Sequence, residues 1–206
     1  MAMACSSKKE EVGGHSDTLN MNNFDFKDEG SVVDWKCLDI KEDQVCIPRD
    51  WKVIEAPSVQ FFSHLGPVAG PELKYEFFTV SKYDTAVIGI GLGQYVQGVS
   101  RQIKLDTVEV PKEGRFQYLT FETSAPCYFG EFLTEVGGKR YFTYTMYTVA
   151  NGFLFDFTLK TKVEDKGKFY KDFRNILFNY RWGGKLLFKK NDPVVSTKIV
   201  DPNNLI

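Results

Sequence analysis

The sequence predicts an α+β fold in which an antiparallel sheet of about six to eight strands is flanked by two helices. Most of the chain alternates apolar and polar residues with a period of two, which is typical of strands. Two segments, at about 92–104 and 167–181, instead repeat apolar residues at helical spacing. Turn signals such as Asn151-Gly152 separate consecutive strands, and Asn-Gly is a strong indicator of a hairpin.

The composition predicts a folded domain and argues against nucleic-acid binding and against a membrane-spanning helix. The 206 residues, 43% of them hydrophobic and 15% aromatic, suffice for one folded domain with a tail. Lys and Arg number 26 against 27 Asp and Glu, so no basic field exists to hold nucleic acid. The longest apolar run, 86–90, is far shorter than the roughly 20 residues of a membrane-spanning helix. We expect neither nucleic acid as a partner nor a transmembrane segment.

The N-terminal segment carries a possible lipidation site at Cys5. Cys5 follows Ala4 and precedes two serines and the charged run Lys8–Glu11, which resembles the junction of a bacterial lipoprotein. The charged run also resembles the export signals of some surface lipoproteins of Bacteroidetes. We therefore interpret 1–4 as a cloning remnant and 5–31 as the anchor cysteine with a flexible spacer. The expected location is the cell envelope, anchored in the outer membrane and facing the periplasm or the exterior; the alternative is an ordinary solvated tail.

The folded domain is expected to begin with a hairpin. Residues 32–38 and 45–48 alternate as strands around a turn at 41–43, which places Cys37 nearly opposite Cys46. Opposite positions can give the short Cβ separation of a disulfide, so we predict that bridge, with two facing thiols as the alternative. Disulfides persist in oxidising compartments, which agrees with export.

A long segment without a clear period follows the next strand. Residues 50–55 alternate as a strand, and the stretch 58–72 then reads as a long loop or an extra turn of helix. It contains Phe61, Phe62 and His64. Loops of this length are often functional, so it is the best loop candidate for a site.

The remaining elements complete the predicted sheet and its helices. Residues 73–81 and 85–91 read as strands, and Leu92, Tyr95, Val96, Val99 and Ile103 then define the first helix. The second helix is followed by a short strand at 185–188 and a polar tail at 191–206. The domain itself is assigned to 32–190. Four further strands are expected at 115–124, 127–135, 139–149 and 153–163.

This order of elements resembles the PsbP-like fold. The resemblance is carried by the segments 46–53, 92–96 and 169–177 and extends over about 45–188. The fold includes the extrinsic photosystem II subunit and the DcrB-type bacterial lipoproteins. It implies a PsbP-like sandwich that acts as a non-enzymatic binding, chaperone-like or assembly module, and it carries over no site residue.

Familiar cofactor and metal motifs are missing from the sequence. The stretch Gly89–Gly93 would need a glycine at Gln94 to match the dinucleotide fingerprint. No histidine or cysteine cluster has the spacing of metal ligands, so no metal and no cofactor is expected. The segment 98–102 lacks the second glycine of a nucleophile elbow, which disfavours a serine hydrolase.

Catalysis would therefore need scattered residues to converge. His64 and Cys127 could form a base and a nucleophile, although Cys127 is more simply a buried apolar residue. An enzyme could also be built from carboxylates such as Glu131 and Glu135, if the fold paired them in a cleft.

Aromatic residues on consecutive strands are the strongest remaining clue. They populate both faces of the predicted sheet, whereas antiparallel sheets usually leave one face to solvent. Coverage by a helix is the favoured explanation; a partner or a ligand would also serve. The residues of the possible binding surface are Phe61, Phe62, His64, Tyr128, Tyr141 and Tyr144.

Three functions follow from these observations. The first is a non-catalytic envelope lipoprotein that binds another envelope protein, for which an exposed aromatic patch without a deep pocket would be evidence. The second is a carrier of a small apolar or lipid-like ligand, which needs a closed apolar pocket under the sheet. The third is an enzyme whose site the sequence does not reveal.

Overall fold

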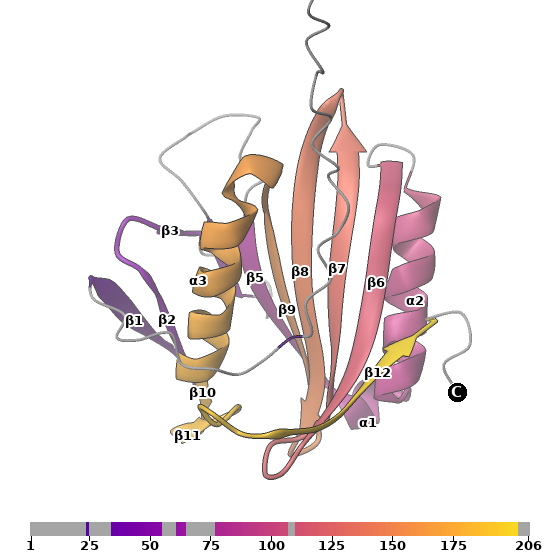
Figure 1. Ribbon diagram of the computed structural model, residues 1–206. Helices are drawn as coiled ribbons and strands as arrows, with labels where there is room; N and C mark the ends of the chain where they lie inside the picture. Colours follow the sequence, from indigo (N-terminus) through magenta and orange to yellow (C-terminus); the bar gives the residue numbers. More distant parts are fainter. Residues whose placement is uncertain (1–23, 25–33, 55–60, 65–76, 107–109, 202–206) are drawn as a thin grey trace, which may run out of the picture.

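Two antiparallel sheets and two long helices form most of the part of the protein that is described in this computed structural model (Figure 1). The structure describes residues 24, 34–54, 61–64, 77–106 and 110–201. The larger sheet has the strand order β12-β6-β7-β8-β9-β5-β4-β3 and the smaller one β1-β2-β10-β11. The strands are β1 (Trp35–Ile40), β2 (Asp43–Pro48), β3 (Lys52–Ile54), β4 (Phe61–His64), β5 (Phe77–Asp84), β6 (Val110–Phe121), β7 (Cys127–Val136), β8 (Lys139–Ala150), β9 (Phe153–Lys162), β10 (Arg181–Trp182), β11 (Lys185–Leu186) and β12 (Val194–Val200).

The helices cover opposite faces of the eight-stranded sheet (Figure 1). Helix α2 (Leu92–Leu105) lies on one face, and α3 (Lys166–Asn179) lies on the other together with the four-stranded sheet. A single turn, α1 (Thr85–Ile88), precedes α2, and a 3-10 turn (Val163–Asp165) precedes α3. The predicted α+β class, the six to eight strands and both flanking helices are confirmed.

Tight turns fix the central strands. Asn151 and Gly152 join β8 to β9 with φ of 49° and 82°, and Gly137 and Gly138 join β7 to β8 with φ of 55° and 77°. Positive φ at both central residues is the geometry whose twist matches the flanking strands, and glycine and asparagine adopt it most readily. The two hairpins predicted from these residues are therefore present.

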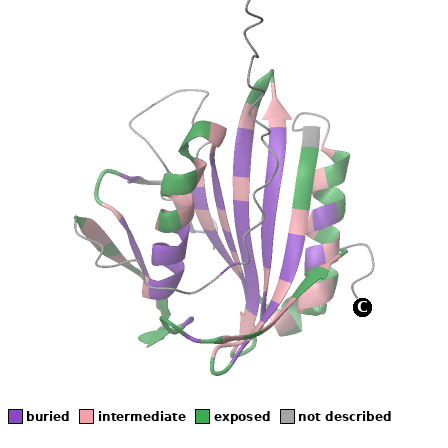
Figure 2. Cartoon of the chain, in the orientation of Figure 1, coloured by how far each residue is buried: buried purple, intermediate pink, exposed green. Residues whose placement is uncertain are grey.

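The α3 face of the large sheet is sealed by aromatic packing. Helix α3 presents Phe173, Ile176 and Leu177 to the sheet, and all three are fully buried. In Figure 2 much of β7 and β8 and part of α3 is coloured as buried. Removing each such side chain from water contributes about 1.5–3 kcal/mol, so this layer dominates the stability of the fold.

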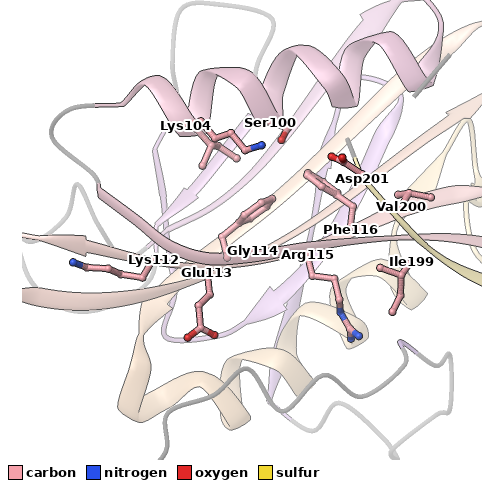
Figure 3. Close-up of a pocket in the computed structure, with 12 residues that line it drawn as sticks. Ser100, Lys104, Lys112, Glu113, Gly114, Arg115, Phe116, Ile199, Val200 and Asp201 are labelled. Atoms are coloured by element: carbon pink, nitrogen blue, oxygen red, sulfur yellow. The ribbon is translucent and has the colours of Figure 1, made fainter. Parts of the chain in front are cut away.

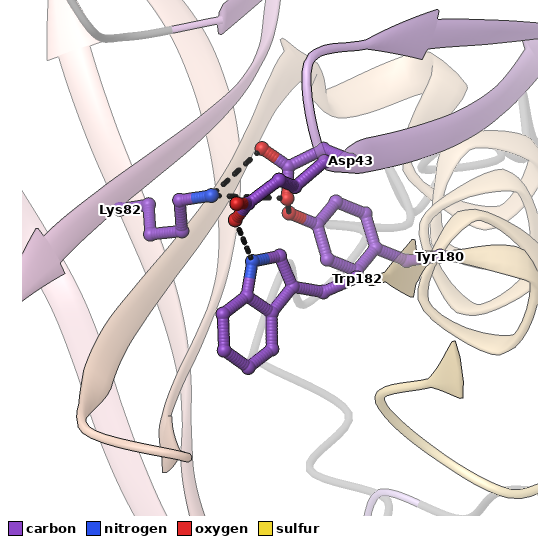
Figure 4. A network of polar contacts seen from close by, with 5 residues as sticks. Asp43, Lys82, Tyr180 and Trp182 are labelled. Carbon is purple, nitrogen blue, oxygen red and sulfur yellow. Dashed lines mark hydrogen bonds and ion pairs between the residues drawn. The ribbon is translucent and has the colours of Figure 1, made fainter. Parts of the chain in front are cut away.

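The small sheet is cross-linked internally by a disulfide and joined to this layer by a polar network. Cys37 lies directly opposite Cys46 in the β1–β2 register, and the two form the predicted disulfide. Asp43 accepts a hydrogen bond of 2.7 Å from the Tyr180 hydroxyl and forms an ion pair of 3.1 Å with Lys82, as Figure 4 shows. Because Lys82 belongs to the large sheet and Tyr180 follows α3, Asp43 connects three elements.

Helix α2 is anchored to the opposite face mainly by its first half. Val96 is fully buried among Phe116, Phe132 and Tyr147. The ring of Phe116 lies over Gly130, where an added Cβ would come within 2.7 Å of a ring carbon. A larger residue at 130 would displace that ring and the helix above it.

Two predicted boundaries are wrong. The stretch 85–91 was expected to be a strand, but the Asp84 carboxylate caps α1 by accepting from the Ala86 amide at 2.8 Å, and Gly89 ends the turn with φ of 64°. The expected polar tail at 191–206 contains β12, which pairs antiparallel with β6 and extends the large sheet. The folded domain therefore continues past residue 190.

The predicted spacer and loop are described only in part. Phe24, assigned to the flexible spacer, is buried; its ring lies 4.5 Å from that of Phe129, and its amide donates to Gln117. The domain thus includes a residue of the segment 5–31. Within 58–72, residues 61–64 form β4, and the rest lies outside the described residues. None of the helices in the described ranges is both long and apolar enough to cross a bilayer.

Candidate functional site

A groove lies between the second half of α2 and the large sheet. Two adjoining hollows form it, and both are lined by Ile103 and Phe132. One hollow, the β6 compartment, has a volume of about 460 Å³ and extends over β6 to the end of β12. The other, the threonine compartment, has a volume of about 230 Å³ and extends over β8, β9 and β5. We call the two together the α2 groove.

The groove exists because the sheet carries small side chains under this half of the helix. Thr143 and Thr145 of β8, Thr134 of β7 and Gly114 of β6 lie where larger residues would fill the space. Ile103 stays only partly buried, unlike Val96 two turns earlier. Helix α2 packs tightly on the sheet only through its first half. Because the side chains of the sheet are small under its second half, a hollow remains there.

The β6 compartment is lined by charged residues around an apolar floor. Figure 3 shows Ser100 and Lys104 of α2 facing the ring of Phe116, with Asp201 beyond it. The side chains of Glu113 and Arg115 point to the other side of β6 in the same view.

The threonine compartment has apolar walls and a floor of hydroxyl groups. Its residues come from five elements because the antiparallel register aligns them on one face: Thr145 lies opposite Thr158, and Thr143 lies opposite Lys160. The apolar walls are formed by Phe77, Val99, Ile103 and Phe132. The polar residues are Asp106, Thr134, Thr143, Thr145, Tyr147, Asp156, Thr158 and Lys160.

Asp156 is the central carboxylate of this compartment. It accepts hydrogen bonds from the Tyr95 hydroxyl at 2.7 Å and from the Thr158 hydroxyl at 3.0 Å. Burial raises the pKa of Asp156, and these two donors act in the opposite direction. Burial also raises the pKa of Tyr95, with the neighbouring carboxylate adding to the effect, so this tyrosine is a donor over the whole physiological range. The pair fixes α2 to β9 and orients the carboxylate.

One hydroxyl in the compartment has no hydrogen-bond partner. The Oγ1 atom of Thr134 is buried and unpartnered, and the residue is only 3% exposed. The Thr145 hydroxyl, equally buried, interacts with the Tyr147 hydroxyl. An unsatisfied buried hydroxyl costs about 1–3 kcal/mol, and Thr161, opposite Phe142 on the α3 face, has another. Lys160 of the threonine compartment places its ammonium 5.7 Å from the centre of the Tyr141 ring.

The residues of the predicted binding surface do not form one surface. Tyr128 and Tyr141 lie on the α2 face, whereas Tyr144 is buried on the α3 face and its hydroxyl donates to the Lys166 carbonyl at 3.2 Å. Phe61, Phe62 and His64 form β4, three strands away from β8, and their side chains are not described. Cys5 lies outside the described residues. Helices α2 and α3 cover the two faces of the sheet, but Tyr118 and Tyr128 on the α2 face stay partly exposed.

The residues considered for catalysis are also dispersed. His64 and Cys127 lie on strands separated by three others, about 19 Å apart at the usual strand spacing. Glu131 and Glu135 are four residues apart on β7, about 13 Å, and each has its own cation: Arg115 at 3.6 Å and Lys112 at 3.3 Å. In the described part of the chain, no group of three His, Cys, Asp or Glu side chains could hold a metal ion.

Glu131 is nevertheless unusual in its protonation. Burial raises its pKa to about 7, and Arg115 offsets the effect only in part. It lies on the α3 face, opposite Arg115 in the β6–β7 register, and does not reach the α2 groove. Glu131 and Arg115 therefore belong to the core on the α3 face.

The sequence matches no protein-family model and no curated protein. Among solved structures, similarity is found to the solution structure of cyanobacterial PsbP (CyanoP) from Synechocystis sp. PCC 6803, with 11% identity and a TM-score of 0.48 over 75% of this chain and 96% of that one. The PsbP-like family that the sequence resembles is thus represented among the similar structures.

Two further structures are similar at a comparable level. A crystal structure from Bacteroides thetaiotaomicron VPI-5482 has 14% identity and a TM-score of 0.41 over 68% of this chain, which spans 45% of the length of that one. LpqN of Mycobacterium tuberculosis, described as involved in cell envelope biogenesis, has 13% identity and a TM-score of 0.41 over 77% of this chain and 83% of that one. Likeness at this level does not transfer a function from one chain to another.

Proposed function

We propose that this protein is a non-catalytic binding domain that takes a small molecule in the α2 groove. The observation that carries the proposal is a hollow of about 230 Å³ with apolar walls and the Asp156 carboxylate in its lining, which adjoins a second hollow of about 460 Å³. Ligand sites commonly combine mostly apolar walls with a few polar groups that fix orientation.

The aromatic side chains support this function over a docking patch of exposed aromatic residues. Tyr141 and Tyr144, expected on a binding surface, are buried under the rest of the domain. The large apolar side chains that are exposed in the described residues are aliphatic, and they include Val87 of α1, Leu105 of α2 and Leu186 of β11. The accessible lining of both compartments is mostly apolar, and both are partly open to solvent, unlike the closed pocket of a lipid carrier.

Filling the groove tests the proposal. Ile103→Trp would occupy the space shared by both compartments, whereas Leu105→Trp, at an exposed position two residues later, is the matched control. Thermal unfolding would be followed with a panel of probes: monosaccharides, cyclic polyols, amino acids, nucleosides and medium-chain fatty acids.

A probe at about ten times its Kd stabilises the folded state by about 1.4 kcal/mol, which raises the Tm of a domain of this size by about 3–5 °C. We expect such a rise for at least one probe with the unchanged chain and with Leu105→Trp, and none with Ile103→Trp. A rise that persists in Ile103→Trp would place binding elsewhere and refute the proposal.

Pairing at the edge of the large sheet is a second candidate. β12 is the outermost strand, and its Val195 and Ile199 are 65% and 69% exposed. The pairing of β12 with β6 is irregular between Val194 and Ser196 and regular over 196–200, so a second copy that pairs antiparallel with the outer edge of 196–200 would cover Ile199. Sedimentation velocity at rising concentration should then show a monomer–dimer equilibrium that Ile199→Lys abolishes; a monomer at all concentrations would refute it.

The location of the domain is part of the same proposal. Anchoring in the outer membrane through a lipid on Cys5 and binding to another envelope protein remain predictions. The Cys37–Cys46 disulfide supports export, because disulfides persist in oxidising compartments. Intact mass of the protein expressed with its native leader in its own host tests the anchor: a diacyl or triacyl adduct on Cys5 supports it, and an unmodified Cys5 refutes it.

A further inference from the structure

The β6 compartment of the α2 groove begins where β12 ends. Ile199, Val200 and Asp201 belong to its lining. Val200 lies opposite Phe116 in the β12–β6 register and packs against the apolar cluster under α2. Figure 3 shows Asp201 beyond the Phe116 ring, at the rim of the hollow. The chain therefore leaves β12 at the entrance to this compartment.

The direction of β12 carries the chain along the compartment. The strand is antiparallel to β6, and the last pair in their register is Val200 with Phe116. A chain that continues in this direction passes Gly114 and then Lys112, which also line the compartment. From Phe116 to Lys112 the strand measures about 13 Å, and the segment 202–206 spans about 17 Å when extended. This segment is therefore long enough to reach across the whole compartment.

The sequence of the segment 202–206 suits a chain that leaves the sheet edge and turns. These residues, Pro-Asn-Asn-Leu-Ile, lie outside the described part of the chain. Pro202 has no N–H to donate, so it ends regular pairing with β6. The two asparagines that follow are of a type favoured in turns. Leu205 and Ile206 are large aliphatic residues, and their removal from water is favourable.

The β6 compartment fits two such side chains. Its apolar floor consists of Ile103, Phe116 and Phe132, and its volume of about 460 Å³ is in the range of sites that hold a drug-sized molecule. The Lys104 and Lys112 side chains of its lining are exposed, so an occupant of the floor leaves their charges in water. The segment 202–206 has no charged side chain that would have to be buried with it.

We propose that residues 202–206 dock in the β6 compartment and place Leu205 and Ile206 on its apolar floor. Because Ile103 and Phe132 also line the threonine compartment, the docked segment limits the space that is open to a ligand. The segment therefore competes with a ligand that extends through both compartments. This competition is a regulation of the α2 groove and rests on its proposed function, whereas the docking itself does not.

Methyl NMR of the whole chain without ligand tests the docking. The methyl groups of Ile, Leu, Val and Thr would be labelled together with the Phe rings. We expect nuclear Overhauser effects from the methyl groups of Leu205 and Ile206 to the ring protons of Phe116 and Phe132. Leu105, which is exposed on α2, is the control and should show none. Absence of these contacts would overturn the proposal, and so would contacts that arise only between labelled and unlabelled copies in a mixed sample, because the occupant would then be a second copy.

A matched pair of double variants measures what the docked side chains contribute. Leu205→Ser with Ile206→Ser removes both aliphatic side chains, so the Tm should fall by about 3–6 °C and the methyl signal of Ile103 should shift. Asn203→Ser with Asn204→Ser changes the preceding residues and should alter neither. An unchanged Tm and an unchanged Ile103 signal in both double variants would contradict the docking.

Decanoate, an extended apolar probe, tests the competition. Its affinity for the variant Leu205→Ser with Ile206→Ser should be about threefold to tenfold higher than for the unchanged chain, because no segment has to be displaced. Equal affinities, or no binding to either chain, would contradict the competition. If the methyl contacts are found but no probe of the panel binds either chain, the proposed function is wrong while the docking stands. If the contacts are absent and a probe binds in the groove, the docking is wrong while the proposed function stands.

Discussion

The two faces of the large sheet are built by the same strands but from different side chains. Along β8, Phe142, Tyr144 and Met146 face α3 and are buried in a continuous apolar layer. The alternate residues Thr143, Thr145 and Tyr147 face α2 and line a hollow. The comparison teaches that α3 seals its face for stability, whereas α2 covers its face incompletely and leaves a partly open hollow.

The largest expected difference between the faces is in the cost of truncation. Phe173→Ala on α3 removes a fully buried ring and should lower the free energy of unfolding by about 3–5 kcal/mol. Ile103→Ala on α2 should cost only about 1 kcal/mol, because this side chain is partly exposed above a hollow. Urea unfolding of both variants measures the difference; equal costs would mean that the α2 groove is packed like a core.

The polar network behind the α3 layer should contribute next. Tyr180→Phe removes the hydroxyl that donates to the Asp43 carboxylate and leaves that acceptor short of one partner. A buried hydrogen bond to a charged group contributes about 1.5–3 kcal/mol, and the free energy of unfolding should fall by that amount. Tyr118→Phe, a partly buried tyrosine of β6 on the α2 face, is the control and should change stability little. A similar loss of unfolding free energy in both variants would mean that the hydrogen bond from Tyr180 to Asp43 does not stabilise the fold more than an ordinary tyrosine hydroxyl does.

The buried Glu131 should make stability depend on pH. Its pKa is about 7 in the folded chain against an ordinary value of 4.5, so between these values the folded state holds a proton that the unfolded state has released. Stability therefore falls as pH rises through this window, by about 1–3 kcal/mol.

Glu131→Gln tests this dependence by removing the titrating group. Its free energy of unfolding, measured at pH 5 and pH 8, should differ less between the two values than that of the unchanged chain. Glu135→Gln, which alters the more exposed carboxylate paired with Lys112, is the control and should keep the original difference. An unaltered pH difference in Glu131→Gln would contradict the raised pKa.

The smallest expected effect has the opposite sign. Thr134→Val removes an unpartnered buried hydroxyl, so the chain without ligand should become more stable by about 1 kcal/mol. Thr120→Val instead removes a hydroxyl that is hydrogen bonded to Ser196 at 2.7 Å, and it should destabilise by a similar amount. Thermal unfolding of the pair checks the signs; destabilisation by Thr134→Val would mean that this hydroxyl has a partner in solution.

Local signals in the sequence were enough to predict the central architecture. Asn151-Gly152 and Gly137-Gly138 fix the two hairpins of β7, β8 and β9, and the spacing of Cys37 and Cys46 about their turn fixes the disulfide register. These features depend on neighbouring residues, so a single sequence reveals them.

The misread elements depend on contacts between distant segments. The strand Val194–Val200 looks like a polar tail, because an edge strand pairs on one side only and β6 lies more than 70 residues earlier. Burial of Phe24 likewise depends on Phe129 and Tyr170. The stretch after Asp84 alternates like a strand, but the capping carboxylate turns it into α1.

The candidate site was missed although one signal for it was present. The sequence of β8 alternates Phe142, Tyr144 and Met146 with Thr143 and Thr145, and the prediction considered only the aromatic residues. Alternation places these threonines on one face, but only the pairing of β8 with β7 and β9 adds Thr134, Asp156 and Thr158 beside them. Helix α2 leaves a hollow over these residues because of how it packs on the sheet. Such packing depends on distant segments and is not visible in a local stretch of sequence.

The central claim is that the α2 face, and not the α3 face, binds a small ligand. The most direct measurement is the methyl NMR spectrum of the unchanged chain, Ile103→Trp and Leu105→Trp, recorded with the probe of the panel that raises the Tm of the unchanged chain most. The account predicts shifts at Thr134 and Thr143 in the unchanged chain and in Leu105→Trp, and none in Ile103→Trp. Shifts that survive in Ile103→Trp, or that appear instead at Val80 and Ile176 on the α3 face, would contradict it.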